Sequence, residues 1–363
     1  MTTEGLRNFW ESQDEYLKDT VEFTLHSLAK SERGQRIIGR LRGGERIYDS
    51  RLFTRIASIT FDNPVMLGAG SDKTGRFVDA SFLLGFSADE VGSVPLEPQP
   101  GNDLPRFFYD RRTHVARNAF GFNSVGAEGV AANLGEQWRL GKVGISLTKN
   151  KDTPESEVPE KIAEAGKILY EYADYFVINF SSPNTPGLRD MMLRQLRETI
   201  RAINKVQDER ANKFRKPIFI KTTIDMGPQD MLNVMQIAAE EGVAGIIDTN
   251  TTVDDNLKAR YSWKGKPGGL SGNDPIYRQR ADERMQFITK ESRGTELARI
   301  GVGAINSPEA AIRRMKLGAQ AVQVVTAMRE TKLRVAQQVN RGLLMEVETE
   351  NLKNISEIVG ADL

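Results

Sequence analysis

The chain has 363 residues, 39% of them hydrophobic, which is enough for one large domain or two medium domains with a substantial buried core. Its 50 basic and 49 acidic residues leave a formal net charge of +1, so no global field recruits nucleic acid, and we expect no nucleic-acid partner. The absence of cysteine excludes disulfides and cysteine catalysis, and the two distant histidines, His26 and His114, leave little basis for a metal site.

Residues 1 to 42 are predicted to form two helices. Apolar residues recur at helical spacing in both: Leu17, Val21, Leu25 and Leu28, then Ile37, Ile38 and Leu41. Such helices either pack on their own domain or contact a lipid edge or a hydrophobic ligand, and the sequence leaves both readings open. Acidic residues near the start and the lack of an 18-residue apolar run argue against a signal peptide or a membrane span, so we expect a soluble or peripheral protein.

Residues 46 to 61 are predicted to form a strand or hairpin at the base of the following domain, because their apolar residues alternate loosely. We therefore divide the chain into an N-terminal helical segment, 1–45, and a second domain, 46–363.

From residue 64 onward, apolar runs typical of strands alternate with longer helical patterns. The predicted strands are 64–67, 88–91, 142–147, 175–180, 217–222, 244–248, 298–302 and 320–325. The predicted helices are 73–84, 124–139, 157–173, 190–208, 228–241, 273–290, 307–316 and 330–346. Eight such units predict an α/β fold, a closed (β/α)8 TIM barrel with an N-terminal helical extension. The alternative is an open doubly wound sheet, but no GxGxxG motif follows the first strand.

The stretch Val177 to Gly187 has the strongest functional pattern. An apolar run ends in Asn179, Ser181, Ser182 and Asn184, which would deliver two amides and two hydroxyls to the carboxyl end of a strand. Amides of this kind can hold a flat, amide-rich substrate, and a hydroxyl between them can accept a proton weakly. The alternative is an ordinary turn that caps a helix.

Other predicted strands also end in polar or glycine-rich segments: Gly68–Lys73, Gly92-Ser93, Ser146–Lys151, Lys221, Thr249–Thr252, Gly301–Ala304 and Val325-Thr326. A further loop carries Gly268–Gly272. Each has a plain structural explanation as a turn, a cap or a solvent-exposed lysine. Glycine-rich loops follow the seventh and eighth strands, where barrels commonly bind phosphate. Taken together, these segments favour a phosphorylated cofactor with a planar substrate.

Several of these motifs resemble dihydroorotate dehydrogenase. The resemblance covers about residue 60 to the C-terminus and is carried by 63–73, 97–106, 148–151, 179–185, 249–252 and 268–272, with the Ser-Ser-Pro-Asn-Thr and Gly-Gly-Leu-Ser-Gly motifs the most specific. The chain is most similar to the membrane-associated, quinone-reducing class, whose general base is serine. The soluble class uses cysteine, which this chain lacks.

The resemblance implies that flavin mononucleotide (FMN) lies across the barrel mouth. The residues expected to contact it are Ala69, Gly70, Lys73, Ser93, Ser146, Asn179, Lys221, Thr249, Gly272, Gly303, Ala304, Val325 and Thr326. The substrate, dihydroorotate, would be held by Lys73 on its carboxylate and by Asn118, Asn179, Asn184, Asn250 and Thr251, with Phe122 screening the site.

Ser182 would take a proton from C5 while a hydride leaves C6, giving orotate. A serine hydroxyl is a poor base, so it needs a path for the proton, for which Thr185 and a water are candidates. The reduced flavin would then pass electrons to a quinone that enters between the N-terminal helices, with Arg106 near that tunnel. A quinone entrance needs an apolar lining, whereas these helices are highly charged. The expected location is the cytoplasmic side of the inner membrane, as a peripheral protein, or the cytoplasm.

Four positions on the flavin side depart from the family pattern. Ser146 stands in place of an Asn, Thr148 and Ala304 each in place of a Gly, and Val325 in place of a residue that is usually Tyr. Each lost hydrogen bond would weaken flavin binding by roughly 0.5–1.5 kcal/mol. Two alternatives therefore stay open: a related flavoenzyme that acts on another small cyclic amide, and a barrel that binds phosphate-bearing ligands without redox chemistry.

Overall fold

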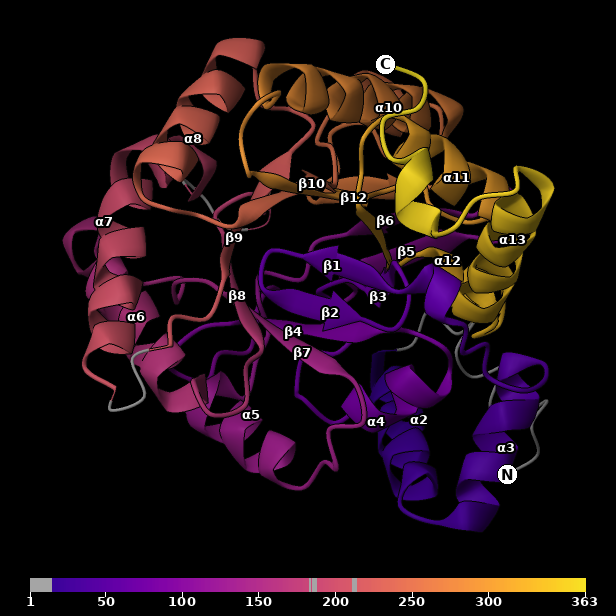
Figure 1. Ribbon diagram of the computed structural model, residues 1–363. Coiled ribbons are helices and arrows are strands. Elements are labelled where there is room, and N and C mark those ends of the chain that lie inside the picture. The colour runs from indigo at the N-terminus through magenta and orange to yellow at the C-terminus, as the bar shows by residue number, and fades with distance from the viewer. Residues whose placement is uncertain (1–14, 183, 185–187, 211–213) are drawn as a thin grey trace.

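Eight parallel strands close into a barrel in the computed structural model, which describes residues 15–182, 184, 188–210 and 214–363 (Figure 1). In chain order the strands are β3 (Val65–Leu67), β4 (Ala88–Val94), β7 (Lys142–Leu147), β8 (Tyr175–Asn179), β9 (Ile218–Thr223), β10 (Gly245–Asn250), β12 (Ala298–Val302) and β13 (Ala321–Val324). The last strand pairs with the first, Val322 opposite Val65, which excludes the open sheet. The predicted eight strands and the barrel are confirmed.

The strands are continuous apolar runs because both of their faces are buried. One set of side chains points into the barrel, where Val177 of β8, Phe219 of β9 and Ile247 of β10 pack together. The alternate set, such as Ile178 and Ile220, packs outward against the helices. This two-sided burial explains why the strands could be recognised from composition alone.

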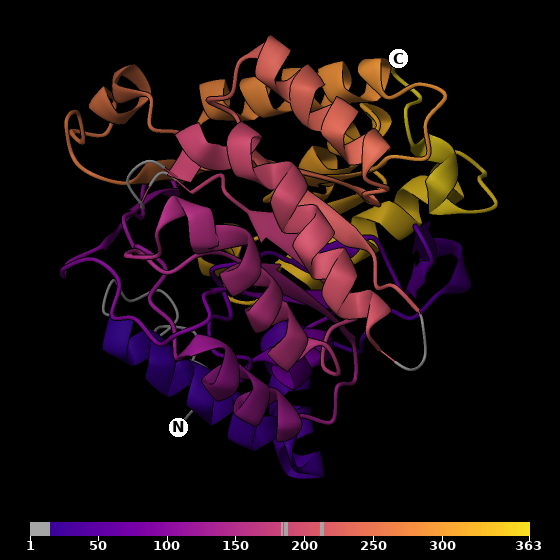
Figure 2. The same cartoon turned by 90° about the vertical axis from the view of Figure 1, so that its left-hand side faces the viewer.

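Helices connect the strands and cover the outside of the barrel. They are α4 (Val78–Leu83), α5 (Gly126–Gly135), α6 (Val158–Leu169), α7 (Leu188–Asp208), α8 (Pro228–Glu240), α10 (Pro275–Glu291), α11 (Pro308–Lys316) and α13 (Val335–Thr349), with the short helices α9 (Asp255–Ala259) and α12 (Ala327–Glu330) in loops. Figure 2 shows successive helices, magenta to salmon, packed side by side on this outer surface.

The first of these helices begins later than the predicted residue 73. The Asp72 carboxylate accepts hydrogen bonds from the backbone N–H groups of Thr74 (2.9 Å), Gly75 (2.7 Å) and Phe77 (2.8 Å). These bonds hold the chain in a loop until α4 begins at Val78. The loop keeps Lys73 at the carboxyl end of β3.

A hairpin closes the amino-terminal end of the barrel, as predicted for residues 46–61. It consists of β1 (Thr54–Ile56) and β2 (Ile59–Phe61), and Figure 1 shows it across the centre of the barrel. Its buried Ile56 and Phe61 pack in the barrel interior with Ala88 and Ala298, which are the first residues of their strands. The opposite, carboxyl end of the strands is thereby the open one.

The N-terminal helices α2 (Glu15–Ala29) and α3 (Glu32–Arg42) lie beside α4 (Figure 1). Val21, Leu25, Ile38 and Leu41 are fully buried in a cluster that includes barrel residues such as Leu343. The helices therefore pack on their own domain, one of the two readings of the sequence. Among the described residues, no helix combines the length and the apolar character that crossing a membrane requires.

A small antiparallel sheet stands next to the open end of the barrel and was not predicted. It joins β5 (Phe107–Asp110), β6 (Val115–Asn118) and β11 (Gly269–Gly272), with Asn118 opposite both Phe107 and Gly269. This sheet brings two segments about 150 residues apart in the chain to one side of the barrel mouth.

Candidate active site

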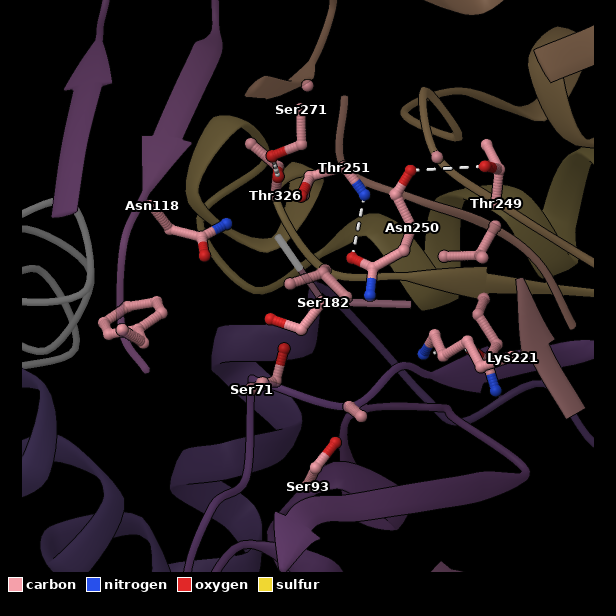
Figure 3. Close-up of a pocket in the computed structure, with 18 of the residues that line it drawn as sticks. Ser71, Ser93, Asn118, Ser182, Lys221, Thr249, Asn250, Thr251, Ser271 and Thr326 are labelled. Carbon is pink, nitrogen blue, oxygen red and sulfur yellow. Dashed lines mark hydrogen bonds between the residues drawn. The ribbon is translucent and has the colours of Figure 1, made fainter. Parts of the chain in front are cut away.

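A cavity opens at the carboxyl ends of the barrel strands. It encloses about 1420 Å³, its open mouth included, and is lined by residues that follow most of the strands and by the small sheet. Figure 3 shows Asn118 on one side of this space, Lys221 on the opposite side and Ser182 between them. Polar groups from distant segments thus meet at the end of the barrel where enzymes of this architecture carry their chemistry.

A chain of hydrogen bonds joins four strand ends beneath the cavity. The Asn179 amide donates to Ser93 Oγ (2.7 Å), which in turn lies 2.8 Å from Ser146 Oγ. On its other side, Ser181 Oγ donates to Asn179 Oδ1 (2.8 Å) and accepts from the Asn250 amide (3.0 Å). Ser181, which is fully buried, therefore fixes the orientation of both amides. It was not predicted as a site residue.

The residue predicted to be the base, Ser182, is 6% exposed and lines the cavity. Its Oγ accepts a hydrogen bond from the Asn184 backbone N–H (3.2 Å), and the Asn184 side chain donates to Asn118 Oδ1 (2.9 Å). The Asn184 backbone thus contacts Ser182, while its side chain is bonded to Asn118 on the small sheet. Thr185, the other predicted member of this group, lies outside the described residues.

Lys73 is held at the rim of the cavity by two contacts. Its Nζ donates to Asn123 Oδ1 (2.8 Å) and lies 3.2 Å from the centre of the Phe120 ring. Phe122, which also lines the cavity, adopts the left-handed conformation with φ of 54°. The tight turn at Gly121 and Phe122 therefore brings both aromatic side chains to the same wall.

Lys221 forms a buried ion pair at the base of the cavity. Its Nζ donates to Glu90 Oε1 (2.8 Å) and Gln323 Oε1 (3.3 Å), and the Gln323 amide donates to the other oxygen of Glu90. The side chains of Lys221 and Glu90 are 5% and 0% exposed. A cation held this way keeps a fixed position and can stabilise negative charge on a bound ring.

Glycines open the remaining wall of the cavity. A side chain at Gly70 would meet nothing within 4 Å, so the backbone there faces open space. Gly272 and Gly303 have φ values of 97° and 88°, and the Ser271 and Thr326 hydroxyls lie 3.0 Å apart beside them (Figure 3). Thr249 and Thr251 also line the cavity. Backbone N–H groups in such glycine-rich turns can bind phosphate.

Three of the four departures from the family pattern have a clear structural consequence. Ala304 has a φ of 54°, so an alanine occupies a left-handed position, at a cost of roughly 1–2 kcal/mol. Thr148 is buried, and its Oγ1 donates to the Asn179 carbonyl (3.3 Å), so it supports the same strand end. Val325 Cγ2 lies 2.9 Å from where a Cβ on Gly68 would stand, which restricts that position to glycine.

The predicted site residues fall on the cavity with few exceptions. Those that line it are Ala69, Gly70, Lys73, Ser93, Asn118, Phe122, Asn179, Ser182, Asn184, Lys221, Thr249, Asn250, Thr251, Gly272, Gly303, Ala304, Val325 and Thr326. Ser146 is fully buried one hydrogen bond behind Ser93. Arg106 is not part of the lining, and its guanidinium donates to the backbone carbonyls of Pro100 and Asn102. Its role in a quinone tunnel stays a prediction.

Sequence reasoning missed Phe107, Phe120, Tyr277 and Arg329 among the residues that line the cavity. Tyr277 donates from its hydroxyl to the Asn250 carbonyl (3.2 Å), and Arg329 lies over the Phe107 ring. None of the four belongs to a predicted strand end.

Comparison with known proteins agrees with this geometry. The family model of dihydroorotate dehydrogenase matches residues 51–347. A protein of Nostoc punctiforme named dihydroorotate dehydrogenase (quinone) is 36% identical over 335 residues, covering 89% of this chain and 87% of that protein. One of Halobacterium salinarum with the same name is 35% identical over 319 residues, covering 87% and 88%.

Solved structures of the enzyme from Eimeria tenella are also similar. The complex with ferulenol superposes with a TM-score of 0.85 at 30% sequence identity, covering 96% of this chain and 95% of that chain. The ligand-free structure superposes with a TM-score of 0.80 at 31% identity, covering 87% and 92%. On the barrel, the cavity and these matches together, the chain belongs to the dihydroorotate dehydrogenase family.

Proposed function

We propose that the protein oxidises (S)-dihydroorotate to orotate in de novo pyrimidine biosynthesis, with FMN as hydride acceptor and a quinone as final electron acceptor. Family membership and the names of the relatives support this reaction. The observation that carries the proposal is the convergence of Ser182, Lys73 and the amides of Asn118, Asn184 and Asn250 on one cavity.

The residues of the cavity fit FMN. Residues from most of the barrel strand ends line it, and Gly70 leaves open space against the backbone for a flat ring. Thr326 and the left-handed turns at Gly272 and Gly303 would hold the phosphate, while Lys221 and Asn179 would face the ring. When bound, FMN accepts the hydride and passes the electrons to the second acceptor.

Lys73 would bind the carboxylate of dihydroorotate. Its ammonium group lines the cavity and matches a carboxylate in charge, and the hydrogen bond to Asn123 fixes its position at the rim. The side chains of Asn118, Asn184 and Asn250 would bind the ring amides. Hydrogen bonds from Asn184 to Asn118 and from Asn250 to Ser181 hold them in place before substrate arrives. This preorganisation lowers the entropy that must be lost on binding.

Ser182 would remove the proton from C5. Its Oγ accepts from the Asn184 N–H, which fixes the hydroxyl next to the amides that would hold the ring. Burial of Ser182 and the nearby Phe122 would limit the water around the reacting atoms. Lys221 would stabilise the negative charge that develops on the far side of the site, and its bond to Glu90 keeps it there.

The names of the relatives support a quinone as the second acceptor, and a quinone acceptor is compatible with a peripheral location at a membrane. Since those proteins are named quinone-dependent, we propose that a quinone reaches the cavity past α2 and α3 and that the protein attaches peripherally to the cytoplasmic side of the inner membrane. Deletion of residues 1–42 is expected to abolish quinone reduction and to spare reduction of a small soluble dye. Equal loss of both activities would count against an entrance at these helices.

The flavin spectrum of the purified protein tests the proposal directly. We expect flavin absorbance, bleaching of that absorbance when dihydroorotate is added without oxygen, and bleaching at least about 100-fold slower in Ser182→Ala. Bleaching by a different dihydropyrimidine but not by dihydroorotate would favour the cyclic-amide alternative. A protein that has no flavin and takes up none would favour a non-redox barrel.

A further inference from the structure

The hydrogen-bond chain beneath the cavity runs in one direction, because backbone N–H groups orient its two amides. Asn250 Oδ1 accepts from the Thr251 backbone N–H (2.8 Å, Figure 3), and Asn179 Oδ1 accepts from the Ser181 backbone N–H (3.2 Å). A backbone N–H can only donate, so the other end of each amide is its NH2 group. Asn250 therefore donates to Ser181 Oγ (3.0 Å), which donates to Asn179 Oδ1 (2.8 Å). At the end of the chain, the Asn179 NH2 donates to Ser93 Oγ (2.7 Å).

Ser146 on β7 is the second partner of Ser93, and its hydroxyl lies 2.8 Å from Ser93 Oγ. Ser146 is fully buried, and in the part of the chain that the structure describes its hydroxyl has no other partner. If Ser93 donated to Ser146, the proton of Ser146 would be buried without an acceptor, which is costly. Ser146 is therefore the donor, and Ser93 Oγ accepts from Ser146 as well as from Asn179.

Two accepted hydrogen bonds leave the Ser93 hydroxyl free only to donate. A serine oxygen has two lone pairs and one hydrogen, and both lone pairs of Ser93 are occupied. Ser93 lines the cavity, and Figure 3 shows its hydroxyl directed toward the space between Ser182 and Lys221. The Ser93 O–H is therefore presented to the molecule that occupies the cavity. It stands at the end of a chain in which each buried hydrogen bond strengthens the next.

We propose that Ser146 is a positioning residue that holds the Ser93 hydroxyl as a hydrogen-bond donor toward the FMN ring, and that this donor favours the reduced form of the cofactor. This inference rests on the proposed function. Reduction places negative charge on the ring, and a donor that is already oriented binds a charged acceptor more strongly than a neutral one. Ser146 is fully buried and is not part of the cavity lining, so it acts through Ser93.

The midpoint potential of FMN bound to the full-length protein tests the proposal without turnover. It is measured by anaerobic reductive titration against a reference dye. In Ser93→Ala, the affinity for reduced FMN relative to oxidised FMN should fall about ten-fold, which lowers the midpoint potential by about 30 mV for a two-electron couple. Ser146→Ala should lower the same ratio by a smaller factor, about two-fold, because Ser93 keeps its proton but loses the bond that directs and strengthens it.

Matched variants complete the experiment. The double variant Ser93→Ala, Ser146→Ala should have the potential of Ser93→Ala alone, because Ser146 acts only through the Ser93 hydroxyl. Ser87→Ala removes another buried hydroxyl, which donates to the Val65 carbonyl (3.1 Å) just before the amino end of β4, and its potential should equal that of the wild type. If Ser146→Ala does not fold, Ser146→Cys keeps nearly the same volume with a much weaker donor and should lower the potential in its place.

Two results would overturn the proposal. One is an unchanged potential in Ser93→Ala, or in both Ser146 variants. The other is a double variant whose potential lies below that of Ser93→Ala, since Ser146 would then act on the cofactor by a separate route. FMN uptake and bleaching by dihydroorotate are recorded first for every protein. A wild type that takes up no flavin refutes the proposed function and this inference with it, whereas normal bleaching with unchanged potentials rejects the positioning role alone.

Discussion

Removing the Lys221 ammonium should expose how much the fold depends on the ion pair beneath the cavity. In Lys221→Met, the carboxylate of Glu90 stays fully buried and keeps only the Gln323 amide as a partner in the trio. Breaking a buried pair from one side costs about 3–5 kcal/mol, because the remaining charge is desolvated without compensation. We therefore expect the free energy of unfolding to fall by about that amount.

The double variant Lys221→Met, Glu90→Gln separates the two roles of the lysine. Removing both charges leaves two neutral side chains of similar volume, so most of the lost stability should return. The proposed electrostatic role cannot return with it, and flavin bleaching by dihydroorotate should remain slow. Urea unfolding and anaerobic stopped-flow bleaching measure the two effects on the same preparations.

Two results would refute this reasoning. If the single and double variants unfold at the same urea concentration, Glu90 is not a buried, uncompensated charge once the lysine is gone. If the double variant bleaches as fast as the wild type, the cation contributes nothing to the reaction. Glu90→Gln alone serves as a control, and its cost should be smaller because Lys221 lines the cavity and can reach water there.

Three further outcomes are expected. Ser181→Ala removes one hydrogen-bond partner from the amide of Asn179 and one from that of Asn250, so stability should fall by about 1–3 kcal/mol and KM for dihydroorotate should rise. An unchanged KM would show that the hydrogen bonds of Ser181 do not orient the two amides. Ala304→Gly removes the strain of a left-handed alanine, so the free energy of unfolding should rise by about 0.5–1 kcal/mol and Tm should rise slightly. A lower Tm would mean that the greater chain entropy of glycine in the unfolded state outweighs the strain. Burial and the nearby Lys30 lower the pKa of His26, against the opposing effect of Glu136, so the folded state holds it neutral while the unfolded state protonates it below about pH 6.5. Stability should therefore fall between pH 7 and 5, and His26→Gln should reduce that fall in urea titrations.

The barrel could be predicted because each strand is recognisable from its own residues. Runs such as 142–147 and 175–180 are apolar on both faces, and the helical pattern between them fixes their parallel order. Helix starts were less predictable, since the delay to Val78 depends on three hydrogen bonds to one carboxylate, Asp72. The spacing of apolar residues in the sequence does not reveal such hydrogen bonds.

The small sheet and Arg329 could not be predicted for a different reason. Strands β6 and β11 come from segments about 150 residues apart, and their glycine and polar residues lack the apolar alternation of a strand. Arg329 stands on the four-residue helix α12, inside a stretch where the sequence predicted a loop and then a helix. Its position on Phe107 depends on pairing between distant parts of the chain.

The hairpin of β1 and β2 makes the two ends of the barrel different, one closed and the other open. Because its side chains fill the amino-terminal end of the barrel interior, dihydroorotate and orotate are expected to enter and leave at the opposite, carboxyl end of the strands. The end of the barrel that the hairpin fills lies away from the candidate active site. We therefore expect substitutions that improve the packing around Ile56 and Ile59 to raise stability with little effect on turnover.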